Sequence, residues 1–196
     1  MTTDELIGVL AARRGHFRLE SGHHGELWLD LDALFARPAR LAPFVADLAE
    51  QLAGCGADVV CGPLVGGAFV AQALAERLAI EASWTERVAA PSGGGLYAAR
   101  YRIPAALRDR LRDRSVAVVD DVVNAGSATR ATIADLRACD ARPITLGALL
   151  VLGEGAGQLA RAEGLALASV ATLANAIWEP ADCPLCAAGV VLETLS

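Results

Sequence analysis

Two adjacent carboxylates, Asp120 and Asp121, stand between an apolar run and a turn of small residues in the middle of the chain. The apolar run covers residues 116–119, and the turn covers residues 124–128. Small residues let backbone N–H groups approach an anion closely, and a helix that begins at such a turn directs the positive end of its dipole toward it. We therefore interpret the turn as a phosphate-binding site. The two acids are placed to hold sugar hydroxyls or, through them, a metal ion.

A simpler interpretation of the same segment is a strand that ends in solvated acids and is followed by an ordinary N-capped helix. A lone acidic pair would favour that interpretation. The apolar strand before the acids and the small-residue turn after them favour a ligand site instead. The hydroxyl groups of Ser127 and Thr129 add two possible hydrogen-bond donors for a phosphate.

Apolar runs alternate with helical patterns along most of the chain, and this alternation predicts an α/β fold with a central, mostly parallel sheet flanked by helices. Ligands bind at the carboxyl ends of such strands, so glycine-bearing turns there mark the expected site. Strands are expected over residues 57–61, 80–87, 96–103, 116–119, 144–152 and 167–173, with a strand-like alternation over 26–32. Helices are expected over residues 3–14, 38–53 and 156–163, after the turn at 62–67 as far as Ala79, and after the turn at 124–128 as far as Ala138.

The composition bounds the remaining possibilities. A chain of 196 residues with 54% hydrophobic and 20% charged residues is expected to fold as one domain. Its net charge of −6 disfavours sequence-independent binding to nucleic acid, which needs a basic surface. The apolar runs are too short to cross a membrane, and the N-terminus lacks a basic-then-apolar signal, so we expect a cytoplasmic protein that does not bind a membrane. Five cysteines, an odd number, argue against a disulfide framework.

Two further features bear on the chemistry. All 17 basic residues are arginines, so no lysine of this chain can take part in a reaction. The glycine-rich stretch at residues 89–95 is predicted to be a mobile loop and not a boundary between domains.

The segment over residues 116–129 resembles the signature with which type I phosphoribosyltransferases bind phosphoribosyl pyrophosphate (PRPP). That signature is an apolar strand, two acids, two apolar residues and a Thr-x-Gly-Thr type loop. Asn124 and Ser127 stand at hydroxyl positions of the pattern, and both side chains can hydrogen-bond phosphate. The motif is specific for PRPP and not for the base that accepts the sugar.

Further segments, in the right order along nearly the whole chain, resemble the orotate branch of that family. Residues 15–22 resemble part of the hood over the base, and residues 61–67 resemble the pyrophosphate loop. Residues 85–87 and 95–102 fall where the flexible catalytic loop belongs, and residues 183–189 resemble a tail seen in some bacterial members. The resemblance therefore implies a homodimer of single-domain chains. Each chain is expected to carry a hood of about residues 1–36 and 174–196 on a core of about residues 37–173.

The resemblance also implies a reaction. PRPP gives its phosphoribosyl group to a nitrogenous base, with release of pyrophosphate through an oxocarbenium-like transition state. The cofactor is Mg²⁺, held through PRPP near the acid pair, and positioning does most of the catalysis. The implied residues are Asp120, Asp121, Arg100 and Arg102 for catalysis; Asn124, Ala125, Gly126, Ser127 and Ala128 for the 5′-phosphate; Pro63, Leu64, Val65, Gly66 and Arg87 for pyrophosphate; and Arg18, Ser21, Trp28 and Glu154 for the base.

Two departures from the family pattern concern charge. The orotate branch usually has a lysine in its mobile loop, and here only Arg87, Arg100 and Arg102 lie nearby. They either replace that lysine at pyrophosphate or are solvated hairpin charges.

The orotate branch also commonly offers an Asp-Arg pair after the strand at residues 144–152, where this chain has Gly153 and Glu154. A Glu there reverses the charge that would meet an anionic base and suits a ring with amino donors; Arg18 is the possible substitute.

Several single residues have a simpler interpretation beside a functional one. His24 could contact substrate, but we expect a surface histidine. Cys183 and Cys186 look like half of a zinc knuckle; only two ligands are clustered, so we expect a tight turn without a metal. Trp28 and Trp84 either line the base pocket or are core aromatics.

Two rival functions remain open beside the orotate reaction. One is a PRPP-responsive regulator or pseudoenzyme, which the missing lysine and Glu154 favour. The other is a transferase for a different base, such as an amino-bearing ring.

Overall fold

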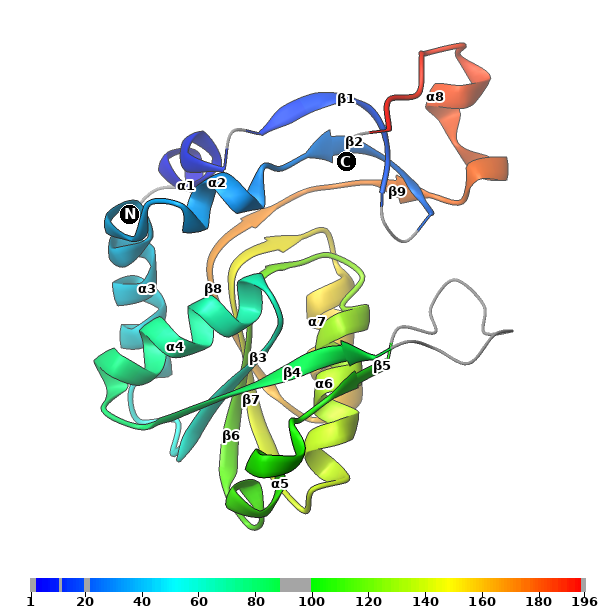
Figure 1. The fold of residues 1–196 in the computed structure, drawn as a ribbon. Coiled ribbons are helices and arrows are strands. Elements are labelled where there is room, and N and C mark those ends of the chain that lie inside the picture. The colour runs from blue at the N-terminus through cyan, green and yellow to red at the C-terminus, as the bar shows by residue number, and fades with distance from the viewer. Residues whose placement is uncertain (1–2, 11, 20–21, 89–99, 195–196) are drawn as a thin grey trace.

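The computed structural model describes residues 3–10, 12–19, 22–88 and 100–194, which form two sheets (Figure 1). The larger sheet has six strands in the order β5-β4-β3-β6-β7-β8, and the smaller has three in the order β1-β2-β9. Within the larger sheet only β5 runs antiparallel to its neighbour. The strands are β1 (Arg13–Arg18), β2 (His24–Trp28), β3 (Val59–Pro63), β4 (Glu81–Val88), β5 (Arg100–Arg102), β6 (Ser115–Val123), β7 (Arg142–Leu152), β8 (Ala166–Leu173) and β9 (Ile177–Trp178).

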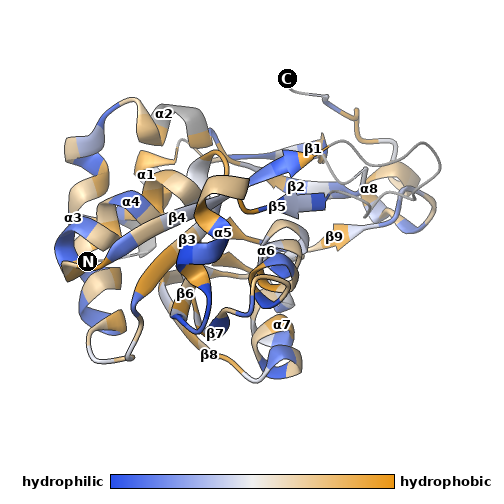
Figure 2. Ribbon diagram, turned by 60° about the horizontal axis from the view of Figure 1, so that its bottom comes forward, coloured by the Kyte–Doolittle hydropathy of each residue, from blue (hydrophilic) through white to orange (hydrophobic). Residues whose placement is uncertain are grey.

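Helices cover both faces of the larger sheet. Successive residues of a strand point to opposite faces, so Val60 and Val119 pack against α3 and α4, while Val59 and Val118 pack against α5, α6 and α7. Figure 2 shows hydrophobic residues on the central strands and hydrophobic and hydrophilic residues alternating along the helices. The expected α/β architecture is confirmed. The helices are α1 (Thr3–Val9), α2 (Leu31–Phe35), α3 (Pro38–Leu52), α4 (Gly66–Leu78), α5 (Ala105–Leu111), α6 (Ser127–Arg137), α7 (Gly155–Glu163) and α8 (Pro184–Ala187), with a 3₁₀ turn at Pro180–Asp182.

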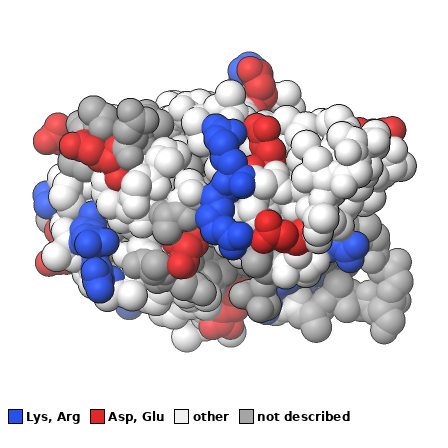
Figure 3. All heavy atoms as spheres, turned by 90° about the horizontal axis from the view of Figure 1, so that it is seen from above, with Lys and Arg blue, Asp and Glu red and all other residues white. Residues whose placement is uncertain are grey.

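The smaller sheet lies beyond the carboxyl ends of the parallel strands and, with the C-terminal tail, forms the hood (Figure 1). It joins the two ends of the chain, since β9 pairs with β2 and Glu193 bridges to Phe17 of β1. On β1, Arg13 pairs with Glu193 at 2.9 Å and Arg14 with Glu26 at 3.6 Å. Seen from the hood side, basic side chains run in a row with acidic side chains beside them (Figure 3). Such exposed pairs contribute little stability.

Two element boundaries differ from the sequence expectation because tertiary pairing overrides local propensity. The helix expected over residues 3–14 ends at Val9, since Arg13 and Arg14 pair with β2. The strand expected over residues 116–119 continues to Val123, since β6 stays paired with β7 as far as Val151. Asp120 and Asp121 are therefore strand residues and do not follow the strand.

Other elements were not expected or were only partly expected. The alternation over residues 26–32 divides into the end of β2 at Trp28 and the start of α2 at Leu31. Helix α5, strand β9 and helix α8 had no counterpart among the expected elements. The predicted mobile loop at residues 89–95 and the first part of the strand expected over 96–103 lie outside the described residues.

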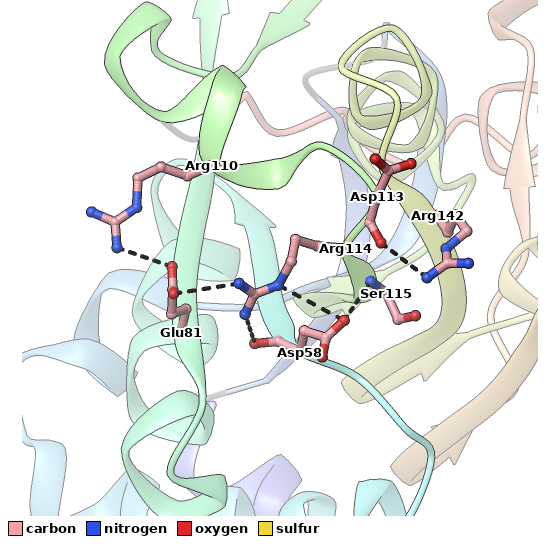
Figure 4. Close-up of polar contacts among 7 residues, drawn as sticks. All are labelled: Asp58, Glu81, Arg110, Asp113, Arg114, Ser115 and Arg142. Carbon is pink, nitrogen blue, oxygen red and sulfur yellow. Dashed lines mark hydrogen bonds and ion pairs between the residues drawn. The ribbon is translucent and has the colours of Figure 1, made fainter.

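The amino ends of four strands carry a polar network on the side away from the hood (Figure 4). Its centre is Arg114, whose guanidinium contacts the Asp58 carboxylate at 3.8 Å and the Glu81 carboxylate at 3.7 Å. The backbone N–H of Ser115 donates to Asp58 Oδ2 at 2.8 Å. These contacts link the starts of neighbouring strands, at the edge of the sheet opposite to the glycine-bearing turns after β3 and β6. The remaining contacts join Arg114 to the carbonyl oxygen of Asp58, Arg110 to Glu81, and Arg142 to the carbonyl oxygen of Asp113.

None of the helices in the described part of the chain is both long and apolar enough to span a bilayer.

Candidate active site

Two glycine-bearing turns meet at the carboxyl edge of the larger sheet. The first joins β3 to α4, and the second joins β6 to α6. A Cβ atom on Gly67 would lie 2.6 Å from Pro63 Cδ and 2.7 Å from Asp120 Oδ1, and a Cβ on Gly66 would overlap the Asp121 carboxylate. Real side chains do not approach so closely, so only glycine fits these positions. The backbone of the first turn therefore rests directly on the acid pair of β6.

The acid pair is buried, with 7% of Asp120 and 8% of Asp121 exposed. Asp120 accepts hydrogen bonds from the Asp121 backbone N–H at 3.1 Å and from the Thr129 hydroxyl at 3.2 Å. Asp121 accepts one from the Val122 backbone N–H at 2.8 Å. Burial, and next the neighbouring charge of Asp121, raise the pKa of Asp120 well above its ordinary value. The pair is thus an electronegative centre that a cation or a cluster of hydroxyl groups would stabilise.

Thr129 has a different role from the one expected. The sequence predicted that its hydroxyl could donate to a phosphate, but the side chain is only 1% exposed and its hydroxyl donates to Asp120 Oδ2. Thr129 is therefore a positioning residue for the acid pair, and that prediction was wrong. The sequence signal for this contact is the position of Thr129 in the first turn of α6, nine residues after Asp120.

The second turn has the geometry of an anion cradle. Gly126 has a φ of 74°, in the left-handed region, and precedes the first residue of α6. Neither a capping side chain nor an acid occupies the first turn of this helix, so its N–H groups point to an unblocked surface. Gly155 at the start of α7 packs against the carbonyl oxygen of Asn124 and leaves no room for a Cβ. Asn124 and Ala128 are half-buried, and Ala125 and Ser127 are exposed beside them.

Four of the five residues expected to bind pyrophosphate, Pro63 to Gly66, lie on the first turn, and the fifth, Arg87, lies on β4. Pro63 is buried at the end of β3, and the next two residues, Leu64 and Val65, are exposed. The backbone N–H of Leu64 donates to the carbonyl oxygen of Thr85 on β4 at 2.8 Å. Thr85 in turn joins its hydroxyl to that of Thr132 on α6 at 2.8 Å. The first turn is thus connected to β6 through the acid pair and to α6 through β4.

The three loop arginines do not share one face. Arg87 of β4 lies opposite Tyr101, Arg100 lies opposite Val88, and Arg102 lies opposite Glu86. Residues directly opposite each other share a face, and successive residues alternate. Arg100 and Arg102 therefore lie on one face of the β4–β5 hairpin and Arg87 on the other. All three are exposed.

The residues expected at the base are divided between the hood and the core. Arg18 is exposed at the end of β1, and Trp28 of β2 is half-buried with its ring centroid 6.2 Å from that of Phe17. Glu154 belongs to the core, where it is exposed at the N-terminus of α7 beside the Asn124 turn. Ser21 lies outside the described residues. Among the described residues, the expected base contacts thus come from both the hood and the core.

Two predictions about the hood were incomplete or wrong. His24 is only 4% exposed, so it is not a surface histidine. Cys183 and Cys186 do lie on one tight helical turn, but two histidines that the sequence did not group with them, His16 and His24, complete a cluster of four.

A doubly covered parallel sheet with two glycine turns and a buried acid pair at its carboxyl edge is the arrangement of an α/β enzyme that binds a phosphorylated ligand. The family model described as "Phosphoribosyl transferase domain" matches residues 30–183. The chain belongs to the phosphoribosyltransferase family, and within its type I group it is similar to the orotate phosphoribosyltransferases.

Curated relatives and solved structures show the same similarity. The chain is 30% identical over 195 residues to the orotate phosphoribosyltransferase of Pelotomaculum thermopropionicum, covering 97% of this chain and 95% of the relative. Its identity to the enzyme of that name from Caldanaerobacter subterraneus is 28%, covering 91% and 87%. The crystal structure of orotate phosphoribosyltransferase from Aeropyrum pernix superposes with a TM-score of 0.70 at 28% identity, covering 88% of this chain and 94% of that one.

The fold by itself does not specify the base. The adenine phosphoribosyltransferase of Thermoanaerobacter pseudethanolicus shares the fold with a TM-score of 0.62 at 17% identity, covering 75% of this chain and 88% of that one. The base must therefore be argued from the side chains under the hood.

Proposed function

We propose that this protein transfers the 5-phosphoribosyl group of PRPP to a nitrogenous base, with orotate as the first candidate, and releases pyrophosphate. The observation that carries the proposal is the direct contact of the Gly66–Gly67 backbone with the carboxylates of Asp121 and Asp120. This contact joins a pyrophosphate turn, a sugar-binding acid pair and a phosphate turn in one site. PRPP is a ligand with those three parts.

The 5′-phosphate is assigned to the turn of Asn124, Ala125, Gly126, Ser127 and Ala128. The uncapped N-terminus of α6 offers N–H groups and a positive partial charge, and an acid-free first turn adds no repulsion. The Asn124 amide and the Ser127 hydroxyl add donors in place of the family's threonines.

Asp120 and Asp121 are assigned to the ribose. In the transition state the sugar gains positive charge as the bond to pyrophosphate breaks. Two buried carboxylates fixed by Thr129 and by backbone N–H groups are already oriented toward such a charge, so they need no rearrangement to stabilise it. A base nitrogen held under the hood then forms the new bond to the same carbon.

Mg²⁺ is assigned as the cofactor. Buried carboxylate oxygens fit a hard, oxygen-preferring cation. Burial, and next the charge of Asp121, raise the pKa of Asp120, so a nearby cation would stabilise its ionised form. Asp120 and Asp121 would hold the ion through the ribose hydroxyls of PRPP. When bound, Mg²⁺ neutralises the departing pyrophosphate.

Arginine residues are assigned the function of the mobile-loop lysine that the orotate branch of the family usually has. Arg87, Arg100 and Arg102 stand on the hairpin that leads into residues 89–99, and guanidinium groups bind phosphate in a bidentate manner. Because Arg87 faces away from Arg100 and Arg102, we assign Arg87 to pyrophosphate and the other two to the catalytic loop function.

Binding of orotate, an anionic base, is compatible with the presence of Glu154 at the edge of the site. The charge reversal would exclude an anionic base if Glu154 were buried, but the side chain is exposed and solvent screens it. Arg18 at the end of β1 can supply the positive partner from the hood. A base that carries amino donors is the second candidate, and Glu154 at the edge of the site is the observation that favours it.

A homodimer is the proposed assembly, in the cytoplasm. Three apolar side chains beside the site are exposed: Leu64 at 40%, Val65 at 60% and Phe69 at 50%. Contiguous exposed apolar surface of this kind marks an interface. A second copy of this chain would cover it.

The experiment is pyrophosphate release from PRPP and Mg²⁺, with orotate and with a panel of purines and pyrimidines. Release that depends on orotate supports the proposal, and release only with an amino-bearing base supports the second candidate. Asp121→Asn should abolish release in either case. Tight PRPP binding without release for any base would overturn the enzyme proposal and favour a PRPP-responsive regulator.

A further inference from the structure

Four side chains with metal-binding atoms meet inside the hood, away from the phosphate turns. They are His16 of β1, His24 of β2, and Cys183 and Cys186 at the start and in the third position of α8. Their ligand atoms all lie within 4.8 Å of one another. His16, His24 and Cys183 are 1%, 4% and 3% exposed, and Cys186 closes the cluster toward solvent.

The distances between the ligand atoms match those around a single tetrahedral ion. His16 Nε2 lies 3.1 Å from His24 Nδ1, 3.4 Å from Cys183 Sγ and 3.7 Å from Cys186 Sγ. Cys186 Sγ lies 3.2 Å from His24 Nδ1. A tetrahedron with metal–nitrogen bonds of about 2.0–2.1 Å and metal–sulfur bonds of about 2.3 Å has edges of about 3.3–3.8 Å. The other two pairs are no more than 4.8 Å apart, so the cluster can enclose an ion with shifts of about 1 Å or less.

The histidines are oriented for ligation. His16 Nδ1 lies 2.9 Å from the carbonyl oxygen of Val190, and a carbonyl can only accept, so Nδ1 carries the proton. In a neutral imidazole the lone pair is then on Nε2, which faces the cluster. A backbone carbonyl that fixes the second nitrogen is the usual support of a metal-binding histidine. His24 directs its Nδ1 into the same cluster, 3.1 Å from His16 Nε2 and 3.2 Å from Cys186 Sγ.

The tail is folded to present both thiols together. Cys183 precedes the first residue of α8, Pro184 begins the helix, and the Ala187 N–H donates to the Cys183 carbonyl at 3.1 Å. Residues three apart on one helical turn face the same side. Gly189, with a φ of 69°, ends the turn and sends the chain back along β1. Neither cysteine is in a disulfide.

We propose that His16, His24, Cys183 and Cys186 bind one Zn²⁺ ion in a structural site that fastens the C-terminal tail to the hood. Two thiolates and two imidazoles in a tetrahedral arrangement select Zn²⁺ among the common divalent ions. All four positions are filled by the protein, so no position is open for substrate, and the site is not catalytic. The inference does not depend on the proposed reaction.

The hood has a physical need for such a fastening. Its three strands have six, five and two residues, which is too little to bury a core of its own. The ligands come from residues 16 and 24 at one end of the chain and residues 183 and 186 at the other. An ion at this point crosslinks the two ends and fixes the position of Arg18, which follows His16 by two residues.

The first test is the metal content of the full chain, purified without a histidine tag and without chelator from zinc-supplemented cells. We expect about one zinc ion per chain by mass spectrometry of the metal. The variant Cys183→Ser/Cys186→Ser should contain less than a tenth of that. The matched control Cys55→Ser, which removes an exposed cysteine outside the cluster, should retain the wild-type content.

A second test keeps the proposal falsifiable if the double variant does not fold. The wild-type chain is reduced, stripped of metal and titrated with Co²⁺, whose tetrahedral thiolate complexes absorb strongly in visible light. We expect these bands at about one equivalent, and we expect Zn²⁺ to abolish them. A mercurial reagent that modifies the thiols of Cys183 and Cys186 should release the zinc ion in proportion to the thiols modified, and this result would support the same site.

Three results would overturn the proposal. The first is wild-type protein that contains no zinc as purified and develops no tetrahedral Co²⁺ bands after reduction. The second is zinc that the double variant retains at the wild-type ratio. The third is iron or a Cys183–Cys186 disulfide in place of zinc in protein isolated under reducing conditions.

Discussion

Gly67 stands against Asp120 so closely that a Cβ atom on the glycine would lie 2.7 Å from Asp120 Oδ1. The glycine belongs to the turn after β3, and the acid belongs to the neighbouring strand β6. The turn proposed to hold pyrophosphate and the acids proposed to hold ribose are therefore one rigid unit. PRPP can contact both the turn and the acids, because Gly67 places no side chain between them.

Gly67→Ala tests this contact. Overpacking of this kind costs about 1–3 kcal/mol of stability, and a displacement of about 1 Å in a site can cost about a hundredfold in rate. We expect a lower melting temperature and a large loss of PRPP-dependent turnover. Gly8→Ala is the control, because a Cβ there meets nothing within 4 Å inside α1, and alanine favours a helix. Wild-type turnover in Gly67→Ala would refute the close contact.

Asp120→Asn is expected to stabilise the protein at neutral pH while it abolishes turnover. The raised pKa of Asp120 means that the folded state holds this proton more tightly than the unfolded chain does. Wild-type stability is therefore fully present below about pH 4, the unfolded value, and is lost as pH rises through the raised pKa. Asparagine removes the buried charge and keeps acceptor and donor groups for the Asp121 N–H and the Thr129 hydroxyl.

The measurement is the melting temperature of both forms between pH 4 and pH 8. We expect Asp120→Asn to melt about 2–4 °C higher at pH 8, for a gain of about 1 kcal/mol, and the difference to disappear near pH 4. Asp109→Asn is the control, because its side chain is 97% exposed. A variant less stable than wild type at pH 8 would contradict the assigned burial and repulsion.

Glu154→Arg tests the charge at the edge of the base site. An arginine there would attract the orotate carboxylate, and an exposed pair contributes about 0.2–1 kcal/mol, so KM for orotate should fall by up to about fivefold. KM for PRPP should stay unchanged. Glu76→Arg makes the same charge change on the exposed surface of α4 and serves as the control. Equal orotate KM values in both variants would remove Glu154 from the base site.

Phe69→Ser tests the proposed homodimer. The side chain is 50% exposed and its ring lies 5.3 Å from that of Phe35, so its outer surface is free to pack against a second copy. Light scattering after size-exclusion chromatography should give a dimer for wild type and a shift toward monomer for Phe69→Ser. Leu167→Ser, at an apolar residue 39% exposed on β8, should leave the dimer intact. A monomeric wild type would exclude the assembly.

The core of the fold could be predicted from sequence because its signals are local. Apolar runs separated by glycine-bearing turns predicted the order of β3, α4, β6 and α6, and with it the meeting of the two ligand turns. Helix α5 was missed because it has only seven residues, three of them arginine or aspartate, and buries only Leu111. Strand β9 was missed because two residues carry no periodic signal.

The sequence predicted only those parts of the site that can be recognised from residue types and their neighbours along the chain. Asp120, Asp121 and the turn at residues 124–128 follow from their neighbours in sequence. The hydrogen bond from Thr129, the division of Arg87 from Arg102 and the meeting of His16 with Cys183 depend on helix position, strand register and a contact across 167 residues. The sequence did carry a sign of the contact between His16 and Cys183. Two histidines, His16 and His24, flank one hairpin, and Cys183 and Cys186 form a CxxC turn.

The most direct test of the central claim is detection of the product. The wild-type protein is incubated with PRPP, Mg²⁺ and orotate, and then with each base of the panel, and the mixture is searched by mass spectrometry for the corresponding ribonucleoside 5′-monophosphate. We predict that a nucleotide forms with wild type and that none forms with Asp121→Asn. Bound PRPP with no nucleotide from any base would contradict the account.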